Sequence, residues 1–259
     1  MSHWYETTGA PMYEIEGANG NIRPTTLRDA RKLNLCPSVT TVLQIIDKPQ
    51  LTKWKVNQVM LAALTLPKVD GETLDEFAIR IRQDAEEQAI EARNVGSEIH
   101  DDIEMIWTGF KPVHHSEIAY AVVESIANKY PDEDFIAEAY VSGDGYGGRC
   151  DLHSENVCID YKGKDITDEQ WTKYQKFLAW NGKGRKPAMP KLAYDEHNMQ
   201  LAAYAKSLCK PNPKLVNVFF DRKIAGRVII IEHEKNMFSK FQAALNLWQE
   251  MKEYKPEID

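Results

Sequence analysis

The stretch that most constrains this chain spans residues 147–162, where two short runs of alternating residues flank a Ser-Glu-Asn turn at 154–156. Serine and asparagine favour tight turns, so the pattern predicts a β-hairpin. Because side chains alternate faces along a strand, Asp160 and Lys162 share one face of the second strand. If that face coincides with the face of Asp151 on the first strand, two carboxylates and an ammonium group converge. Such a group is typical of a metal site with a cationic helper.

The other residues of the hairpin predict its surroundings. Val157, Ile159 and Tyr161 point away from Asp160 and are expected in a core. Cys150 and Cys158 are expected on opposite faces, which argues against a disulfide between them. The four cysteines lack Cys-x-x-Cys spacing, so a zinc knuckle is not expected. We interpret them as reduced thiols of a cytosolic protein.

The composition indicates a chain that folds around its own core. The 259 residues are enough for one large domain or two small ones, and 43% of them are hydrophobic. No apolar run approaches the roughly 18–20 residues that span a bilayer. The N-terminus lacks the basic and apolar regions of a secretory signal. We therefore expect a cytoplasmic protein that does not engage a membrane.

The net charge of −7 argues against a protein that coats nucleic acid by bulk electrostatics. It is compatible with a nucleic-acid enzyme whose acidic residues bind metal and whose basic residues are local.

The N-terminal region is predicted to be mainly helical after a strand and an Asn-Gly turn at 13–21. Helices are expected over 38–46 and 50–64. Trp54 stands between two lysines in the second of these. Such a tryptophan usually packs in a core, and stacking on a nucleobase is the alternative.

A long helical pattern covers residues 73–107, with a capping box of Thr73 and Glu76 at its start. It predicts one long helix or two consecutive ones. Gly96 and His100 are four residues apart and share a face. A glycine inside a helix costs about 1 kcal/mol relative to alanine, which makes sense where something approaches closely. A histidine beside an apolar stripe is more often structural than a ligand.

The remaining regular elements alternate between helices and strands. A helix is predicted over 116–129, and a strand over 135–141 in which Glu138 alternates with apolar residues. With the central hairpin this gives three consecutive antiparallel strands. A second hairpin is expected over 215–231, followed by a last helix over 236–254.

The segment 171–194 differs from the rest of the chain because it contains six lysines or arginines and no Asp or Glu. Interleaved aromatic and basic residues suit single-stranded nucleic acid, because cations follow the phosphates and rings stack on the bases. A solvated amphipathic helix with a loop explains the composition equally well. The candidate substrate-binding residues of the segment are Trp171, Lys173, Lys176, Arg185 and Lys186.

A helix is predicted over 195–208, where Gln200 and Tyr204 are four residues apart on one stripe. A buried glutamine needs hydrogen-bond partners. We expect Gln200 to bond to the backbone beside the site.

An Asp-x-Lys sequence alone is common, whereas the joint pattern is much more selective. In chain order it reads Gly96-x-x-x-His100, Glu138 on a strand, Gly148-x-x-Asp151, Asp160-x-Lys162 and Gln200-x-x-x-Tyr204. This pattern resembles the PD-(D/E)XK nuclease superfamily and, within it, the RecB-like exonucleases. The resemblance covers residues 95–210, with a weaker echo at 37–54.

The resemblance implies an α/β (α+β) fold with a restriction-endonuclease-like core, in which helices flank a central mixed β-sheet. We expect a single nuclease domain over 1–259, because no repeat or clean linker divides the chain. Its parts are a mostly helical region at 1–94, a catalytic core at 95–210 with a basic insertion at 165–194, and a β-hairpin and helix at 211–259.

The family pattern also implies the roles of individual residues. The implied metal ligands are His100, Asp151, Asp160 and the backbone carbonyl of Tyr161. The implied catalytic residues are Lys162, Asp160 and Glu138, the last of which supports a metal-bound water or a second metal. Gln200 and Tyr204 are implied to hold the site and the DNA strand.

The chain departs from the family in two places. Asp160 stands where many relatives have Glu, and its shorter arm would draw the metal closer to the strand. The stretch between Lys162 and Gln200 is long and basic. Some relatives bind an iron–sulfur cluster through one early and three late cysteines, whereas Cys209 is alone at the late position. No iron–sulfur cluster is therefore expected.

The chemistry also follows from the residue types. Hard carboxylate oxygens favour one or two Mg²⁺ or Mn²⁺ ions, and an imidazole ligand shifts the preference toward Mn²⁺. Such ions polarise a phosphate and make hydroxide available near neutral pH. Lys162 can orient the attacking water and offset the developing charge. We therefore predict a metal-dependent DNA exonuclease that hydrolyses phosphodiester bonds and, by family analogy, leaves a 5′-phosphate.

The basic segment favours DNA with a free single-stranded end as the substrate, and a duplex end-resecting exonuclease is the alternative. A non-catalytic nucleic-acid-binding subunit on a nuclease fold is the alternative from another class. The intact Asp–Asp–Lys set argues against it, because a binding module has no use for paired acids that face a phosphate. Analogy at the level of the fold suggests phage-type recombination, repair or replication, with proteins of those processes as partners.

Overall fold

The structure is a computed structural model that describes residues 3–258; residues 1 and 2, which belong to the segment considered above for a secretory signal, and residue 259 lie outside that part. A five-stranded sheet with the order β5-β6-β7-β8-β9 forms its centre. The strands are β5 (Ile136–Gly143), β6 (Tyr146–His153), β7 (Val157–Lys164), β8 (Lys214–Asp221) and β9 (Val228–His233). Strands β7 and β8 are parallel and the other neighbours are antiparallel, so the sheet is mixed, as predicted.

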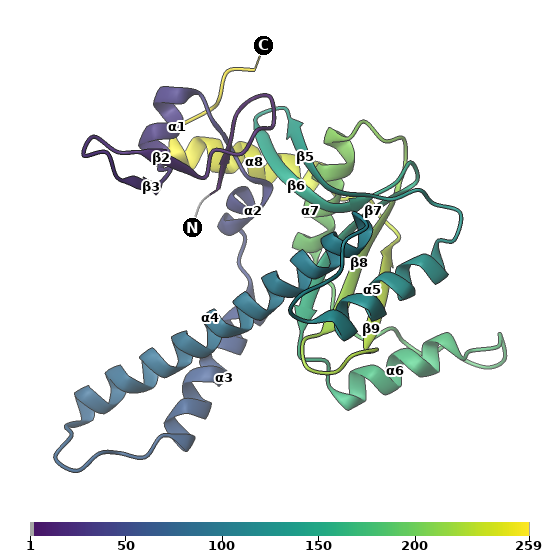
Figure 1. Ribbon diagram of the computed structural model, residues 1–259, viewed down its shortest axis with the longest axis horizontal. Coiled ribbons are helices and arrows are strands. Elements are labelled where there is room, and N and C mark those ends of the chain that lie inside the picture. Colours follow the sequence, from purple (N-terminus) through teal and green to yellow (C-terminus); the bar gives the residue numbers. More distant parts are fainter. Residues whose placement is uncertain (1–2, 259) are drawn as a thin grey trace.

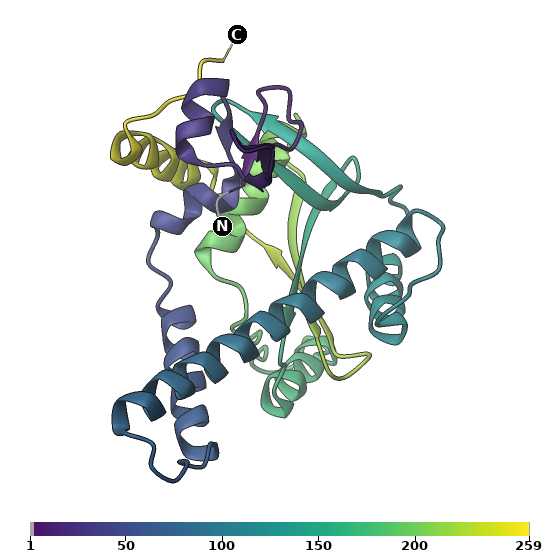
Figure 2. The same cartoon turned by 60° about the vertical axis from the view of Figure 1, so that its left-hand side comes forward.

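Helices cover both faces of the sheet, as Figures 1 and 2 show. The helices are α1 (Leu27–Leu33), α2 (Val39–Val42), α3 (Pro49–Thr65), α4 (Leu74–Trp107), α5 (Ser116–Lys129), α6 (Asp168–Leu178), α7 (Asp195–Ser207) and α8 (Phe238–Lys252), with a 3₁₀ turn η1 (Leu43–Ile45). Helices α4 and α5 pack on one face, and α7 and α8 pack on the other. The predicted mixed α/β fold is therefore confirmed. Within residues 3–258, no helix combines the length and apolar character needed to cross a bilayer.

The helix boundaries follow capping signals in the sequence. Thr73 and Glu76 form the predicted capping box at the start of α4, with each side chain accepting from the other residue's backbone N–H. Thr167 and Gln170 begin α6 in the same way. The pattern over 73–107 forms one continuous helix of 34 residues, which is about 51 Å long at 1.5 Å per residue.

Short strands supplement the helices of the N-terminal region. They are β1 (Trp4–Tyr5), β2 (Glu14–Glu16), β3 (Ile22–Pro24) and β4 (Cys36–Pro37), paired as β1–β4 and β2–β3. The β2–β3 hairpin contains the predicted strand and Asn-Gly turn. Trp4 shares a core with α8, where its ring lies 6.1 Å from that of Trp248. Strand β1 and helix α8 therefore share the core on one face of the sheet.

Helix α3 and the first half of α4 form a projecting arm, which Figures 1 and 2 show at one side of the sheet. Ala62, Ile81 and Ala85 form a small core within the arm. The second half of α4 lies on the sheet, where Ile99 and Ile103 are fully buried. One continuous helix thus joins the arm to the sheet and fixes its direction.

The central hairpin divides its side chains between the two faces. Val157, Ile159 and Tyr161 are buried in the core under α4 and α5, as predicted. Cys158 lies in the core under α7 and α8. The odd and even residues of β7 therefore serve different cores, which leaves Asp160 and Lys162 on the α7 side.

The prediction that Cys150 and Cys158 lie on opposite faces is wrong. Their Sγ atoms are 3.4 Å apart, and both thiols are buried and free. Strands β6 and β7 pair only at Leu152–Ile159 and His153–Cys158. Because the strands diverge beyond these pairs, the alternation of a flat hairpin no longer fixes the direction of Cys150.

Replacing Ile159 by alanine should lower the free energy of unfolding by about 2–5 kcal/mol, because a fully buried side chain would leave a cavity. Chemical denaturation followed by circular dichroism measures this change. Ile136→Ala is the control, because Ile136 is 60% exposed on β5, and its effect should stay within about 0.5 kcal/mol. Equal losses in the two variants would contradict the described core.

Candidate active site

The candidate site lies where strands β6 and β7 separate. Asp151 precedes the paired residue Leu152 on β6, and Asp160 follows its partner Ile159 on β7, so both acids lie just beyond the last pair. The Oδ2 atom of Asp151 accepts the backbone N–H of Tyr161 at 2.7 Å. In a continued antiparallel ladder this N–H would donate to a backbone carbonyl of β6. Here it donates to a side chain of β6 instead. This fork brings the two predicted acids to the same gap.

Asp160 is buried and held from two sides. The Nζ atom of Lys162 lies 2.7 Å from Oδ1 and 2.6 Å from Oδ2 of Asp160. The Nδ2 atom of Asn217 donates to Oδ2 at 2.8 Å. Asn217 stands opposite Asp160 in the parallel β7–β8 ladder, and its Oδ1 lies 2.7 Å from Nε2 of His233. Asn217 and His233 were not predicted, because no local pattern indicates which strand lies beside β7.

His100 reaches the fork from α4. Its Nδ1 lies 3.7 Å from Oδ2 of Asp151, and its ring packs edge-on against those of Tyr161 and Phe220. Burial, together with the charge of Lys162, lowers the pKa of His100 to about 4. The ring is therefore neutral at pH 7, which is the form that ligates metal ions.

Glu138 lies on β5 and adopts a left-handed backbone with φ 56°. The pairing of β5 with β6 is interrupted between Ala137 and Ala139 at this residue. A non-glycine residue in that region costs on the order of 1–3 kcal/mol, and such strain clusters at functional sites. The carboxylate forms an ion pair with Arg149. Burial, followed by the charge of Asp151, raises the pKa of Glu138 to about 8.

Burial disfavours the charged form of both acids of the fork. Burial raises the pKa of Asp151. Burial and the neighbouring Asp151 raise the pKa of Asp160 to about 6, although Lys162 opposes the shift. An added cation would stabilise both carboxylates in their charged form. Two carboxylates and a neutral imidazole also form a donor set that suits Mg²⁺ or Mn²⁺.

The side chains are not closed around an ion in this arrangement. Among residues 3–258, no group of three or more His, Cys, Asp or Glu side chains is placed to hold a metal. Both oxygens of Asp160 instead face Lys162. The residue types fit a divalent cation, and chelation requires Asp160 to exchange one of these contacts for the ion.

Helix α7 supports Lys162 from the other side of the fork. The Oε1 atom of Gln200 accepts from Nζ of Lys162 at 3.3 Å, and its Nε2 donates to Oη of Tyr204 at 3.0 Å. The expectation that Gln200 bonds to the backbone is therefore wrong. The ring of Tyr204 packs on Gly148, where a Cβ would come within 2.6 Å of the ring, so this position requires glycine. Tyr204 is only 4% exposed and acts on Lys162 through Gln200.

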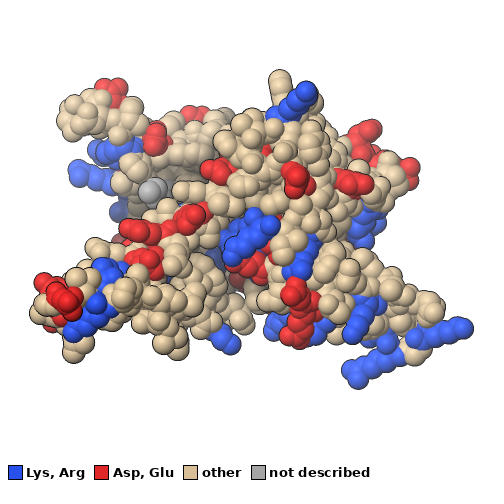
Figure 3. All heavy atoms as spheres, turned by 60° about the horizontal axis from the view of Figure 1, so that its bottom comes forward, with Lys and Arg blue, Asp and Glu red and all other residues tan. Residues whose placement is uncertain are grey.

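An open cleft runs past Lys162. Two hollows of about 470 and 640 Å³ meet there, and both are also lined by Trp54 and Arg222. Gly96 lines the smaller hollow, and a Cβ at this position would meet no atom within 4 Å. The close approach expected one turn before His100 is therefore not made by any of the described residues. Figure 3 shows a group of basic side chains near the middle of the molecule in that view.

The five predicted residues of the basic segment, all of them described, line neither of these hollows. Trp171 packs against the core under α6, and Lys173 pairs with Glu169 at 2.6 Å. Lys173 and Lys176 line a separate hollow. Arg185 and Lys186 are exposed in the loop after α6. Figure 3 shows this part of the chain as a protrusion with basic side chains toward its tip.

Comparison with known proteins yields only distant similarity. No family model matches the sequence, and no curated protein matches it either. Among solved structures, the chain is similar to an alkaline exonuclease, LHK-Exo, from Laribacter hongkongensis, with 12% identity, a TM-score of 0.35 and coverage of 78% of this chain and 92% of that one. It is also similar to the protein SSO0001, with 15% identity, a TM-score of 0.33 and coverage of 78% and 84%. Similarity at these scores does not define a family, so the RecB-like assignment stays a prediction.

Replacing Asn217 by leucine should weaken Mn²⁺ binding by about 10–100-fold, because Asp160 loses the donor that orients it. Isothermal titration calorimetry with Mn²⁺ measures the affinity, and circular dichroism checks the fold. His233→Gln is the matched control. It changes the partner of Asn217 without touching Asp160, so its loss should be smaller. A folded Asn217→Leu variant with the parent affinity would contradict the orienting role.

Proposed function

We propose that this chain is a metal-dependent DNA exonuclease that hydrolyses phosphodiester bonds. The observation that carries the proposal is the fork itself. Asp151 and Asp160 meet there beside His100 from α4 and Lys162, and Lys162 lines an open cleft. Two neighbouring acids whose pKa values are raised by burial have little structural use without a cation, whereas hydrolysis of an anionic diester requires one.

The proposed ligands of a Mg²⁺ or Mn²⁺ ion are His100, Asp151, Asp160 and the backbone carbonyl of Tyr161. An ion bound there would polarise the phosphate and supply hydroxide near neutral pH. The chain prepares for it in two ways. The N–H of Tyr161 fixes the carboxylate of Asp151, and Asn217 fixes that of Asp160. Neither acid therefore needs to reorganise its backbone when the ion binds.

Lys162 is the proposed catalytic cation. Its side chain is 26% exposed and lines the cleft, and its ammonium group donates to Gln200. A compact charge at this place can orient the attacking water and offset the charge that develops on the phosphate. The link from Gln200 to Tyr204 limits the directions that the lysine can take.

Glu138 and Arg149 form the proposed second layer of the site. Burial and the charge of the nearby Asp151 raise the pKa of Glu138, and the ion pair with Arg149 opposes this shift. Arg149 also lines the smaller hollow, where a phosphate can compete for it. We propose that Glu138 supports the attacking water or a second ion once substrate draws Arg149 away.

DNA with a free single-stranded end is the proposed substrate, in the setting of recombination, repair or replication, with proteins of those processes as partners. The basic residues near α6 lie apart from the fork, so we propose that they contact DNA beyond the reacting nucleotides. The exposed residues Lys176, Arg185 and Lys186 suit such a contact because their charges face solvent.

Lys162→Ala should lower the rate of DNA hydrolysis by about 100–1,000-fold or more, because the cation that stabilises the reacting phosphate is lost. Hydrolysis of end-labelled DNA with Mn²⁺ measures the rate. Lys129→Ala is the matched control, because this lysine pairs with Glu232 on a surface away from the fork, and it should keep the parent rate. A purified Lys162→Ala protein that degrades DNA at the parent rate would refute the assignment.

The parent protein should degrade linear single-stranded DNA with Mn²⁺, spare single-stranded circles and be inactive in EDTA. An exonuclease needs an end, and the acids need a cation to act on a phosphate. The assay compares linear and circular DNA in single- and double-stranded form. Preferred degradation of duplex ends indicates the duplex-resecting alternative. Binding of DNA without degradation under all conditions indicates a non-catalytic subunit and sinks the proposal.

A further inference from the structure

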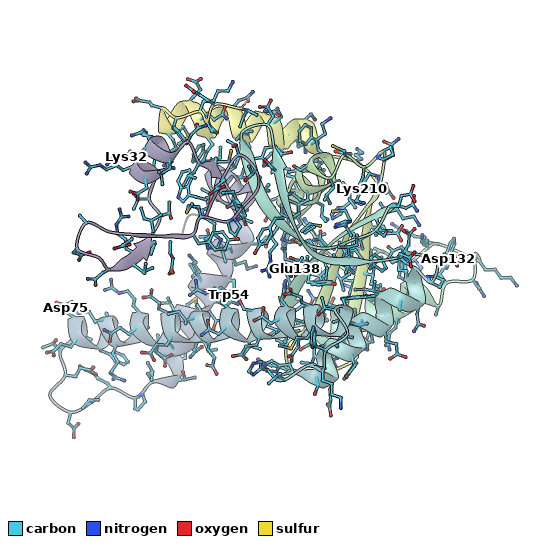
Figure 4. All side chains as sticks on the ribbon, turned by 45° about the horizontal axis from the view of Figure 1, so that its top comes forward. Lys32, Trp54, Asp75, Asp132, Glu138 and Lys210 are labelled. Carbon is cyan, nitrogen blue, oxygen red and sulfur yellow. The ribbon has the colours of Figure 1, made fainter. Side chains whose placement is uncertain are left out.

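Trp54 occupies an unexpected place for a large aromatic residue. It is half-buried, yet it belongs to none of the four hydrophobic cores formed by the described residues. Figure 4 labels it on α3, at the base of the arm. Its side chain lines both hollows that meet at Lys162. Core packing, the more usual role of such a residue, therefore does not describe Trp54.

The arm is attached to the sheet by contacts that do not involve Trp54. Helix α4 runs without a break from the arm onto the sheet, where Ile99 and Ile103 are buried. Arg222 adds a second tie, since its Nη1 donates to the carbonyl of Ala92 on α4 at 3.0 Å. Trp54 thus lines the cleft while the arm is anchored by other contacts.

Lysines gather in the larger hollow next to Trp54. Lys48, Lys162 and Lys164 all line it. Burial and the charge of Lys162 lower the pKa of Lys164 to about 8, and the same two causes lower that of Lys48. Like charges that crowd one hollow favour an anionic ligand.

Lys164 is fixed in this position. Its Nζ donates to the carbonyl of Leu192 at 2.9 Å and lies 4.9 Å from the ring centroid of Tyr194. The acids of the hollow do not cancel the positive charge. Asp165 is paired with Arg222 at 2.8 Å and with Lys223 at 3.1 Å, and Lys162 is paired with Asp160. Glu196 is therefore left to oppose both Lys48 and Lys164.

We infer that the hollow bounded by Lys48, Trp54 and Lys164 is a subsite for one unpaired nucleotide, whose base stacks on Trp54 and whose phosphate lies among the lysines. The inference rests on the proposed function and names the substrate contact next to the reacting bond. A volume of about 640 Å³ suits a ligand of this size. A base that stacks on a side chain in such a hollow is separated from its complement, so the subsite selects single strands.

Trp54 is a better candidate for stacking on a base than the tryptophans of the basic segment. Trp171 packs against the core under α6. Trp180 is 37% exposed, but its Nε1 donates to the carbonyl of Lys183, and the Nζ of Lys186 lies 5.6 Å from its ring centroid. Trp54 differs from both because it lines the cleft beside Lys162.

The test places one abasic nucleotide at successive positions of a short single-stranded DNA and measures binding in EDTA by fluorescence anisotropy. In the parent, one position near an end should weaken binding by about 5–150-fold, the value of one stacked base. In Trp54→Leu the loss at that position should shrink below about twofold, because leucine fills space without offering a ring face. Trp54→Phe should keep part of the loss.

One comparison variant and one control measurement separate stacking from support of the fold. Trp180→Leu should keep the full loss at the abasic position. A purely structural Trp54 would weaken binding of every oligonucleotide equally in Trp54→Leu and leave the loss at that position intact. Thermal unfolding of Trp54→Leu checks that the chain is folded.

The contact between the lysines and the phosphate is tested by the salt dependence of DNA binding. Lys48→Ala should reduce the slope of log affinity against log salt by about 0.7, the value of one phosphate contact on a single strand. Lys32→Ala is the matched control and should leave the slope unchanged, because Lys32 is an exposed residue of α1 that Figure 4 labels far from Trp54.

The outcomes separate this inference from the proposed function. A Trp54→Leu protein that keeps the full loss at the abasic position overturns the subsite, even where the parent degrades DNA. The parent protein can also bind DNA without cleaving it, while Trp54→Leu loses the effect of the abasic position. That result supports the subsite and overturns the proposed nuclease activity. A parent that neither binds nor cleaves DNA overturns both.

Discussion

The site depends on one hydrogen bond, in which the carboxylate of Asp151 accepts the backbone N–H of Tyr161. In an ordinary antiparallel ladder this N–H would bond to the backbone of β6. Because a side chain takes it instead, β6 and β7 separate after Leu152 and Ile159. The gap admits groups from both faces of the sheet, the imidazole of His100 from α4 and the amide of Gln200 from α7. Without the fork, the closed sheet would keep these groups apart.

The electrostatics of the fork are unfavourable for the chain alone. Burial raises the pKa values of both Asp151 and Asp160, the charge of Asp151 adds to the shift of Asp160, and Lys162 acts as the internal counter-ion. An ammonium group that bridges two carboxylate oxygens is a compact cation that can give way to a divalent ion. Asn217 keeps the carboxylate of Asp160 in place during that exchange, because its own position is fixed by the parallel ladder and by His233. The contacts that Asp160 makes with Lys162 and Asn217 therefore both stabilise the buried acid and position it for an ion.

The long helix α4 connects the chemistry to substrate selection. Its buried half carries His100, and its projecting half supports α3, which places Trp54 over the cleft. Gly96 leaves the helix surface open between the two. A single rigid element can thus set the distance between the reacting groups and the ring on which a base stacks. Flexible loops would hold that distance less well.

Local sequence signals determined most of the elements of this protein. Helical periodicity and caps placed α5 at residues 116–129 and the start of α4 at Thr73, and turn chemistry placed the central hairpin. The joint motif also selected His100, Asp151, Asp160 and Lys162, which the structure brings together.

Tertiary structure alone decided what no local pattern encodes. The parallel pairing of β7 with β8 brought Asn217 beside Asp160, and the divergence of β6 and β7 brought Cys150 against Cys158. The direction of the arm put Trp54 at the cleft, and the packing of α6 placed Trp171 against a core. The physical reason is that caps and periodicity act within a few residues. Strand neighbours and helix directions are set instead by burial of surfaces far apart in the chain.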